Sequence, residues 1–140
     1  MIYLDTSVVA PFYWTEALSD AVDELLRQEV ELGISSLVEV ELCSALSRRV
    51  RMGEIERGEA EAIANRFQID RNNGFYIQLA VELIHYDKAR DWIRQFDTPL
   101  RTLDALHLAI AVSHNIPLVT ADAGLVASAD ILGIETQLVR

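Results

Sequence analysis

Residues 100–124, LRTLDALHLAIAVSHNIPLVTADAG, contain in one run a helix, a break, a short strand and a turn. The apolar segment from Thr102 to about His114 predicts a buried helix with Thr102 as its cap. Asn115–Pro117 ends that helix, because proline lacks the amide hydrogen that a continuing helix needs. Leu118–Thr120 then predicts a short buried strand, and a turn leads into another helix. Alternation of this kind is typical of α/β proteins.

The rest of the chain repeats the alternation. Ser36 has Glu39 three residues after it, a capping-box pattern, and Gly53 ends the helix that Ser36 begins. Asp5, Thr6 and Ser7 are candidate caps for a helix after the first strand. Helices are expected at about 16–29, 36–52, 54–71, from Val81 or Tyr86 to Phe96, 102–114 and from the turn at Ala121–Gly124 to about Leu132. Strands are expected at 2–4, 32–35, 75–79, 118–120 and 135–139.

Short apolar strands between helices predict a three-layer α/β sandwich, in which helices flank a mostly parallel central sheet. The chain has 140 residues, enough for one domain with its own core, so we expect a single domain over 1–140. Apolar residues make up 51% of the sequence. We therefore expect either a large core or an apolar surface that another subunit covers.

The composition limits which cellular compartment and which classes of partner we expect. No apolar run approaches the eighteen or so residues of a membrane helix, and MIYLD at the start lacks the basic segment of a signal peptide. A single cysteine, Cys43, cannot form an internal disulfide, which favours a reducing cytoplasm. The net charge of −10 opposes nucleic-acid binding unless the carboxylates hold metal ions and the arginines cluster. Eleven of the twelve basic residues are arginine, a bias that suits phosphate recognition or reflects genome composition.

Four acidic residues stand among apolar neighbours. Asp5 and Asp122 each follow a strand, Glu41 lies inside the helix begun at Ser36, and Asp104 lies in the first turn of the helix from Thr102. Ligands of parallel sheets bind beyond the carboxyl ends of the strands. Several buried carboxylates would repel one another, and a hard cation such as Mg²⁺ or Mn²⁺ relieves that conflict.

Each acid also has a simpler interpretation. Asp104 can be a stabilising charge at a helix N-terminus, and Asp5 and Asp122 can be helix caps. Glu41 can lie on an exposed flank of its helix, and His107 is expected to be a hydrogen-bonded neighbour of Asp104 rather than a metal ligand. Glu39 is two residues before Glu41 and should point to a different helix face.

Four segments together resemble the PIN-domain proteins, specifically the VapC-type ribonuclease toxins of type II toxin–antitoxin systems. They are IYLDTSVV, ISSLVEVELCSAL, LRTLDALHLAIA and PLVTADAGLVASA, and they span almost the whole chain in the family's order. The resemblance implies that Asp5, Glu41, Asp104 and Asp122 are both the catalytic residues and the ligands of one or two Mg²⁺ or Mn²⁺ ions. It implies that Thr6 and Thr120 support the site. The implied activity is hydrolysis of RNA phosphodiester bonds with a metal-activated water, leaving a 5′-phosphate.

The resemblance also implies partners: an RNA substrate, a cognate antitoxin and a second copy in a homodimer, with no membrane. Pro11–Trp14, PFYW, offers aromatic anchors for the antitoxin or packs in the core. Arg48, Arg49 and Arg51 are candidates for contacts to the RNA backbone, or are favourable charges at a helix C-terminus.

Three alternatives belong to other classes. One is a PIN-fold protein that is not a toxin, or that binds RNA only as a scaffold; the presence of all four acids opposes the scaffold. Another is a phosphohydrolase like the haloacid dehalogenases, suggested by DTS at Asp5. That group needs a second aspartate where Ser7 stands. The third is a signal-receiver module, but this sequence lacks the acidic pair and the lysine that such a module needs.

Overall fold

In the part of the chain that the structure describes, five short strands form one sheet in which every pairing is parallel. Since the strand order is β3-β2-β1-β4-β5, β1 is central, with Ile2 beside Leu32 of β2 and Tyr3 beside Leu118 of β4. The computed structural model describes residues 1–29 and 31–140. The strands are β1 (Ile2–Leu4), β2 (Leu32–Ser35), β3 (Ile77–Leu79), β4 (Leu118–Thr120) and β5 (Thr136–Leu138). The predicted sheet is confirmed, and it is wholly rather than mostly parallel.

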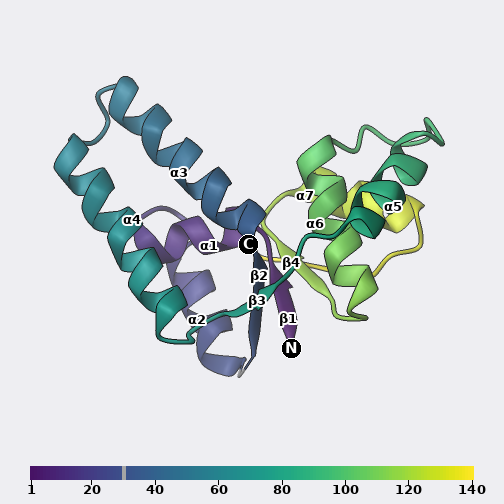
Figure 1. Cartoon of the computed structure of the whole chain (residues 1–140), viewed down its shortest axis with the longest axis horizontal. Helices are drawn as coiled ribbons and strands as arrows, with labels where there is room; N and C mark the ends of the chain where they lie inside the picture. Colours follow the sequence, from purple (N-terminus) through teal and green to yellow (C-terminus); the bar gives the residue numbers. More distant parts are fainter. Residues whose placement is uncertain (30) are drawn as a thin grey trace.

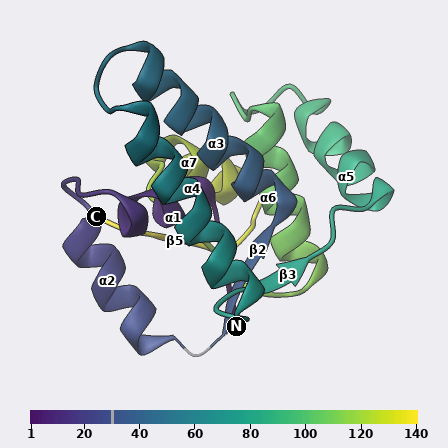
Figure 2. The ribbon, with the colours of Figure 1, turned by 60° about the vertical axis from the view of Figure 1, so that its left-hand side comes forward.

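In the described residues, 1–29 and 31–140, seven helices cover the two faces of the sheet. They are α1 (Thr6–Tyr13), α2 (Ser19–Gln28), α3 (Ser36–Arg51), α4 (Arg57–Asn72), α5 (Leu83–Ile93), α6 (Thr102–Ser113) and α7 (Ala123–Ile131). Figure 1 shows α1 to α4 on one side of the strands and α5 to α7 on the other. The helices α3 and α4 pack against each other as a hairpin whose tip extends away from the sheet (Figure 2).

Alternation along β1 creates a core on each face. The buried side chains of Ile2 and Leu4 join the core under α1 to α4, whereas Tyr3 joins the core under α5 to α7. Successive residues of a strand point to opposite faces, so three residues supply both cores. The predicted three-layer sandwich is therefore confirmed.

Several predicted boundaries are wrong by a few residues. Ser35, not Ser36, caps α3: its hydroxyl accepts the amide hydrogen of Leu37 at 3.3 Å. The cap position of α6 is Arg101, and Thr102 is already helical. The predicted helices from Glu16 and Glu54 begin later, at Ser19 and Arg57, and the strand expected from residue 75 is only three residues long. Among the helices in residues 1–29 and 31–140, none has the length and apolarity to cross a membrane.

Candidate active site

The central strands β1 and β4 place two acidic residues at one edge of the sheet. The strand order reverses between them, because β2 and β3 follow β1 on one side while β4 and β5 lie on the other. Asp5 follows β1 directly, and Asp122 follows β4 after Ala121. The carboxyl ends of strands at such a reversal form a crevice, the usual ligand site of a parallel sheet.

Asp5 is almost fully enclosed, with 4% of its surface exposed. Its two carboxylate oxygens accept hydrogen bonds from the hydroxyls of Ser7 and Thr120, each at 2.6 Å. Burial raises the pKa of Asp5 and the negative charge of Glu41 raises it further, although these hydroxyls and His107 oppose the shift. The position after β1 thus holds a carboxylate that is costly to ionise, and a nearby cation would reduce that cost.

Asp104 and Asp122 line one cavity of about 200 Å³ between the loop before α6 and the start of α7. Burial raises the pKa of Asp104, and the charges of Asp122, Asp5 and Glu41 raise it further, against the effect of His107. Asp122 also caps α7, since one of its oxygens accepts the amide hydrogens of Gly124 and Leu125 at 2.8 and 3.2 Å. The cap predicted for Asp122 is therefore correct, and its second carboxylate oxygen remains for a ligand.

Glu41 reaches the same region from α3. Its Oε1 accepts a hydrogen bond from the hydroxyl of Thr6 at 3.0 Å and another from Nε2 of His107. Burial alone would raise the pKa of Glu41, but the hydrogen bond and charge of His107 and the hydrogen bond from Thr6 lower it. The expectation that His107 hydrogen-bonds Asp104 is wrong: on α6 the imidazole lies one turn after Asp104, and it pairs with Glu41 instead.

The structure places the other three acids selected from the sequence within electrostatic range of Asp104, with Thr120 on Asp5 and Thr6 on Glu41. Within residues 1–29 and 31–140, no group of three or more His, Cys, Asp or Glu side chains is close enough to hold a metal ion. Mg²⁺ typically binds one or two carboxylates and keeps several waters. The donors present, which are carboxylates and hydroxyls, fit an ion of that kind, with water completing its shell.

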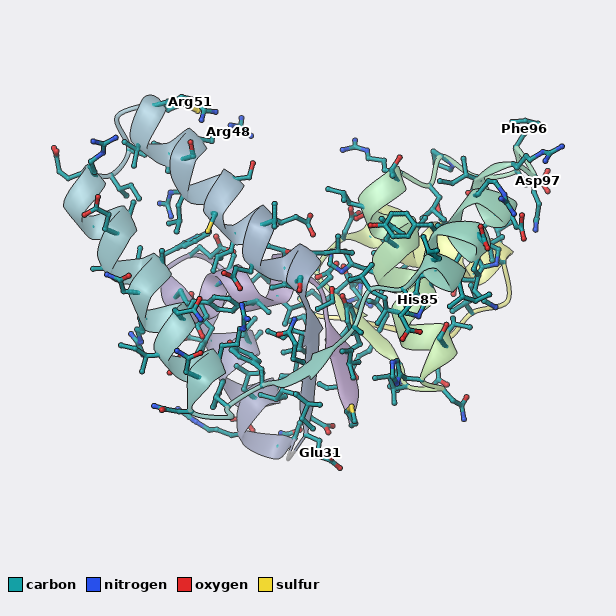
Figure 3. All side chains as sticks on the ribbon, viewed as in Figure 1. Glu31, Arg48, Arg51, His85, Phe96 and Asp97 are labelled. Atoms are coloured by element: carbon teal, nitrogen blue, oxygen red, sulfur yellow. The ribbon has the colours of Figure 1, made fainter. Side chains whose placement is uncertain are left out.

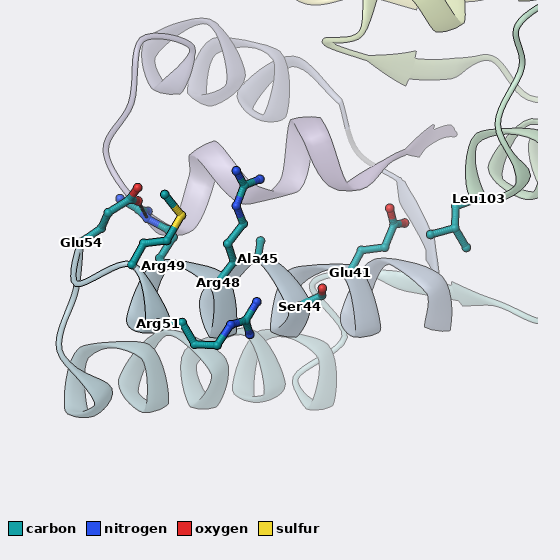
Figure 4. A pocket seen from close by; sticks show the side chains of 9 residues that line it. Glu41, Ser44, Ala45, Arg48, Arg49, Arg51, Glu54 and Leu103 are labelled. Atoms are coloured by element: carbon teal, nitrogen blue, oxygen red, sulfur yellow. Dashed lines mark hydrogen bonds and ion pairs between the residues drawn. The ribbon is translucent and has the colours of Figure 1, made fainter.

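An arginine-rich cleft of about 530 Å³ runs along α3 from Glu41 (Figure 4). Arg48 lines it and makes no ion pair among the described residues. Arg49 lies with its guanidinium carbon 5.0 Å from the centre of the Trp14 ring and its Nε 3.3 Å from Glu54. Arg51 donates a hydrogen bond to Ser47 at 2.6 Å. Of the three arginines predicted to contact RNA, Arg48 and Arg51 make no ion pair among the described residues, and Arg48 also makes no side-chain hydrogen bond to them.

The family can now be assigned. The PIN domain model matches residues 2–130 of the 140-residue chain. The chain belongs to the PIN-domain family. No curated protein has a significantly similar sequence.

Solved structures share the fold of this PIN domain. VapC20 of Mycobacterium tuberculosis, described as a sarcin–ricin loop cleaving toxin, is 20% identical with a TM-score of 0.74, over 91% of this chain and 95% of that one. VapBC2 of Rickettsia felis, bound to promoter DNA, is 19% identical with a TM-score of 0.68, over 98% of both chains. VapBC-1 of nontypeable Haemophilus influenzae is 18% identical with a TM-score of 0.67, over 99% and 98%. At these identities the likeness establishes the fold alone.

The aromatic segment of the PIN domain at Pro11–Trp14 is engaged within the chain. The hydroxyl of Tyr13 donates to Asp70 at 2.7 Å and lies 2.9 Å from that of Tyr76. The Phe12 ring stacks on Phe75 at 5.6 Å. Of the two predictions for this segment, packing against the core is confirmed, with Tyr13 buried and with Phe12 and Trp14 partly buried.

Sequence reasoning missed three polar residues of the site. Ser7 donates to Asp5, while Tyr3 and Ser35 connect to His107 inside the protein. A tyrosine in the middle of the apolar strand Ile2–Leu4 was the available signal, because a buried phenol needs a hydrogen-bond partner. Burial raises the pKa of Tyr3, so its hydroxyl stays protonated at neutral pH.

Proposed function

We propose that this PIN domain is a metal-dependent endoribonuclease and the toxin of a toxin–antitoxin pair. The observation that carries the proposal is the environment of Asp104. In a first helical turn, where the helix dipole stabilises negative charge, its pKa is nonetheless raised by burial and by the charges of Asp122, Asp5 and Glu41. Carboxylates that raise one another's pKa in this way are typical of a site for a divalent cation.

Asp5, Glu41, Asp104 and Asp122 are the residues that would hold one or two Mg²⁺ or Mn²⁺ ions, supported by Thr6 and Thr120. When bound, the metal would supply a hydroxide nucleophile near neutral pH and stabilise the charge of the transition state. The hydroxyls of Ser7 and Thr120 fix the Asp5 carboxylate, and Thr6 with His107 fixes that of Glu41. These contacts hold the acids in place before the substrate arrives.

An RNA strand would pass the arginine-rich cleft on its way to the acids. Glu41 and Arg48 line the same cleft, so a chain bound through its phosphates at Arg48 would reach the carboxylates along α3. Cleavage by water with loss of the 3′ oxygen would leave a 5′-phosphate and would require no attack by a 2′-hydroxyl. Arg49 and Arg51 would add positive charge at the far end of the cleft.

The proposed partners follow from the family and its neighbours. The similar structures include toxin–antitoxin complexes, which supports a cognate antitoxin for this chain. A homodimer would cover part of the exposed apolar surface, which includes Leu83 and Phe96 with 82% and 86% of their surface exposed. We place the protein in the cytoplasm, where its RNA substrate would be found.

The direct test is cleavage of a mixed, structured RNA by the purified protein with Mg²⁺, Mn²⁺ or EDTA. We expect metal-dependent cutting that Asp104→Asn reduces by about 100-fold or more, because even a residue that only supports a metal ligand contributes about 10–100-fold. Asp97→Asn is the matched control, since it removes the same charge from an exposed loop at the far end of the molecule (Figure 3).

Each alternative predicts a different result. An RNA-binding scaffold would bind the RNA without cutting it under any metal. A nuclease that is not a toxin would cut RNA but leave growth unaffected when expressed. A haloacid-dehalogenase-like phosphohydrolase, which has no support from the family match, would hydrolyse phosphomonoesters and spare RNA.

A further inference from the structure

A buried chain of hydrogen bonds ends on Glu41. The hydroxyls of Ser35 and Tyr3 lie 2.8 Å apart, and the Tyr3 hydroxyl lies 2.6 Å from Nδ1 of His107. Nε2 of His107 then contacts Oε1 of Glu41. Because a carboxylate oxygen only accepts, Nε2 must carry the hydrogen, and in the neutral ring Nδ1 must accept from Tyr3. The acceptor at the end of the chain determines the direction of every bond in it.

The interior members of this hydrogen-bond chain have no access to solvent. Tyr3 and Ser35 are fully buried, and His107 has 1% of its surface exposed. Glu41 differs, since 26% of its side chain is exposed and it lines the arginine-rich cleft. His107 therefore cannot meet an RNA strand, and it can act on bound molecules only through Glu41.

The hydrogen-bond chain also connects the two faces of the sheet. Glu41 belongs to α3 on one face and His107 to α6 on the other, and Tyr3 contributes from the central strand β1. Oε1 of Glu41 is occupied by both His107 and Thr6, whereas Oε2 takes no hydrogen bond from the described residues. The carboxylate is held by one oxygen and leaves the other for a ligand.

We propose that His107 is a positioning residue that orients Glu41 for metal binding, with Tyr3 and Ser35 completing the buried hydrogen-bond chain behind its imidazole. The inference rests on the proposed function, because it assigns Glu41 a role at the metal. Support of this kind, in which a buried group holds a ligand in one orientation, affects both metal affinity and rate.

The experiment compares His107→Asn with His107→Gln. The amide nitrogen of glutamine takes the place of Nε2 and can still donate to Glu41, whereas that of asparagine takes the place of Nδ1 and cannot. Mn²⁺ affinity is measured by calorimetry, and kcat on RNA is measured at saturating Mn²⁺. His114→Asn is the matched control, because His114 caps the exposed end of the same helix.

We expect His107→Asn to weaken Mn²⁺ binding by about 10–100-fold, His107→Gln to recover most of that loss, and His114→Asn to change nothing. In a Glu41→Gln background, His107→Asn should add little to the loss of Mn²⁺ affinity, because the carboxylate that His107 orients is already absent. In the metal-free wild type, ¹⁵N NMR should find His107 with its hydrogen on Nε2.

Two results would overturn the inference about His107 while leaving the proposed function intact. Wild-type cleavage with unchanged Mn²⁺ affinity and kcat in folded His107→Asn would leave a nuclease whose His107 is only structural. A purely additive double variant would show that His107 does not act through Glu41. A wild type that neither binds Mn²⁺ nor cuts RNA would overturn the proposed function, and the inference with it.

Discussion

At the scale of single residues, Asp104 illustrates how the surroundings of a candidate site can reduce the stability of the fold. The helix dipole favours a carboxylate in the first turn of α6. Burial, Asp122 and Asp5 nevertheless raise the pKa of Asp104. A carboxyl with a raised pKa stabilises the fold while protonated, below its unfolded pKa of about 3.9, and this contribution is lost as the pH rises through the folded pKa. At neutral pH the ionised Asp104 therefore destabilises the metal-free protein.

We expect Asp104→Asn without metal to raise the Tm at pH 7.5 by about 2–4 °C, the shift that roughly 1 kcal/mol produces in a chain near this size. Below about pH 4 the gain should disappear, because the wild-type carboxyl is then protonated as well. Mn²⁺ should raise the Tm of the wild type and not that of the variant. Calorimetric melts across this pH range test the prediction. A lower Tm for the variant at pH 7.5 would mean that the helix dipole dominates.

At the scale of an element, α3 carries two opposite charges on one face. Glu41, Ala45, Arg48 and Met52 recur at intervals of four, three and four residues, so they share a face of the helix, and all four line the cleft. Glu39, two residues before Glu41, points elsewhere and pairs with Arg71 of α4, as its position predicts. The helix thus presents a carboxylate near the sheet and a cation towards its tip (Figures 3 and 4).

We expect Arg48→Ala to weaken RNA binding at every sequence tested, because a phosphate contact carries no base specificity. The slope of log KM against log salt should fall by about 0.7, the loss of one phosphate contact to a single strand. Arg27→Ala is the control, since Arg27 lies on α2 in an exposed pair with Glu24. Titrations of KM with KCl provide the measurement. An unchanged slope would remove Arg48 from the RNA path, and unchanged Mn²⁺ affinity would show that the metal site is intact.

At the scale of the whole molecule, the two central strands β1 and β4 support both cores. Tyr3 and Leu118 belong to the core under α5 to α7, while Leu4 and Val119 from the same strands belong to the core under α1 to α4. Neither face can unfold without exposing the strands on which the other face packs. We therefore expect a single cooperative domain over 1–140, as the length predicts.

The two tryptophans allow that prediction to be tested. Trp14 packs against one core and Trp92 against the other. Trp14→Phe and Trp92→Phe each leave one fluorescent reporter, on opposite faces of the sheet. We expect fluorescence and far-UV circular dichroism to give the same midpoint within each variant, although both variants are destabilised relative to the wild type. Separate midpoints for the two faces would divide the chain into two folding units.

The sequence by itself determined the element types and their alternation. Local patterns such as the apolar strand before Asp5, Gly53 after α3 and Asn115–Pro117 after α6 act over a few residues, so they predict a parallel sheet without any knowledge of contacts. They also selected four acids, since a carboxylate among apolar neighbours is costly to bury unless it is paired, hydrogen-bonded or bound to a metal, and the structure places three of them within electrostatic range of the fourth, Asp104. Helix starts were less predictable, because neighbouring serines such as Ser35 and Ser36 are equally good caps by type.

Only the tertiary structure decided which partner each side chain has. His107 lies three residues from Asp104 in the chain, yet it hydrogen-bonds Glu41, 66 residues away. Tyr3 meets His107 across 104 residues, and the rings of Phe12, Tyr13 and Trp14 pack against the core. The physical reason is that local propensity determines whether a segment forms a helix, a strand or a turn. Which distant side chains become partners is decided by burial and hydrogen bonding, once the sheet order β3-β2-β1-β4-β5 has formed.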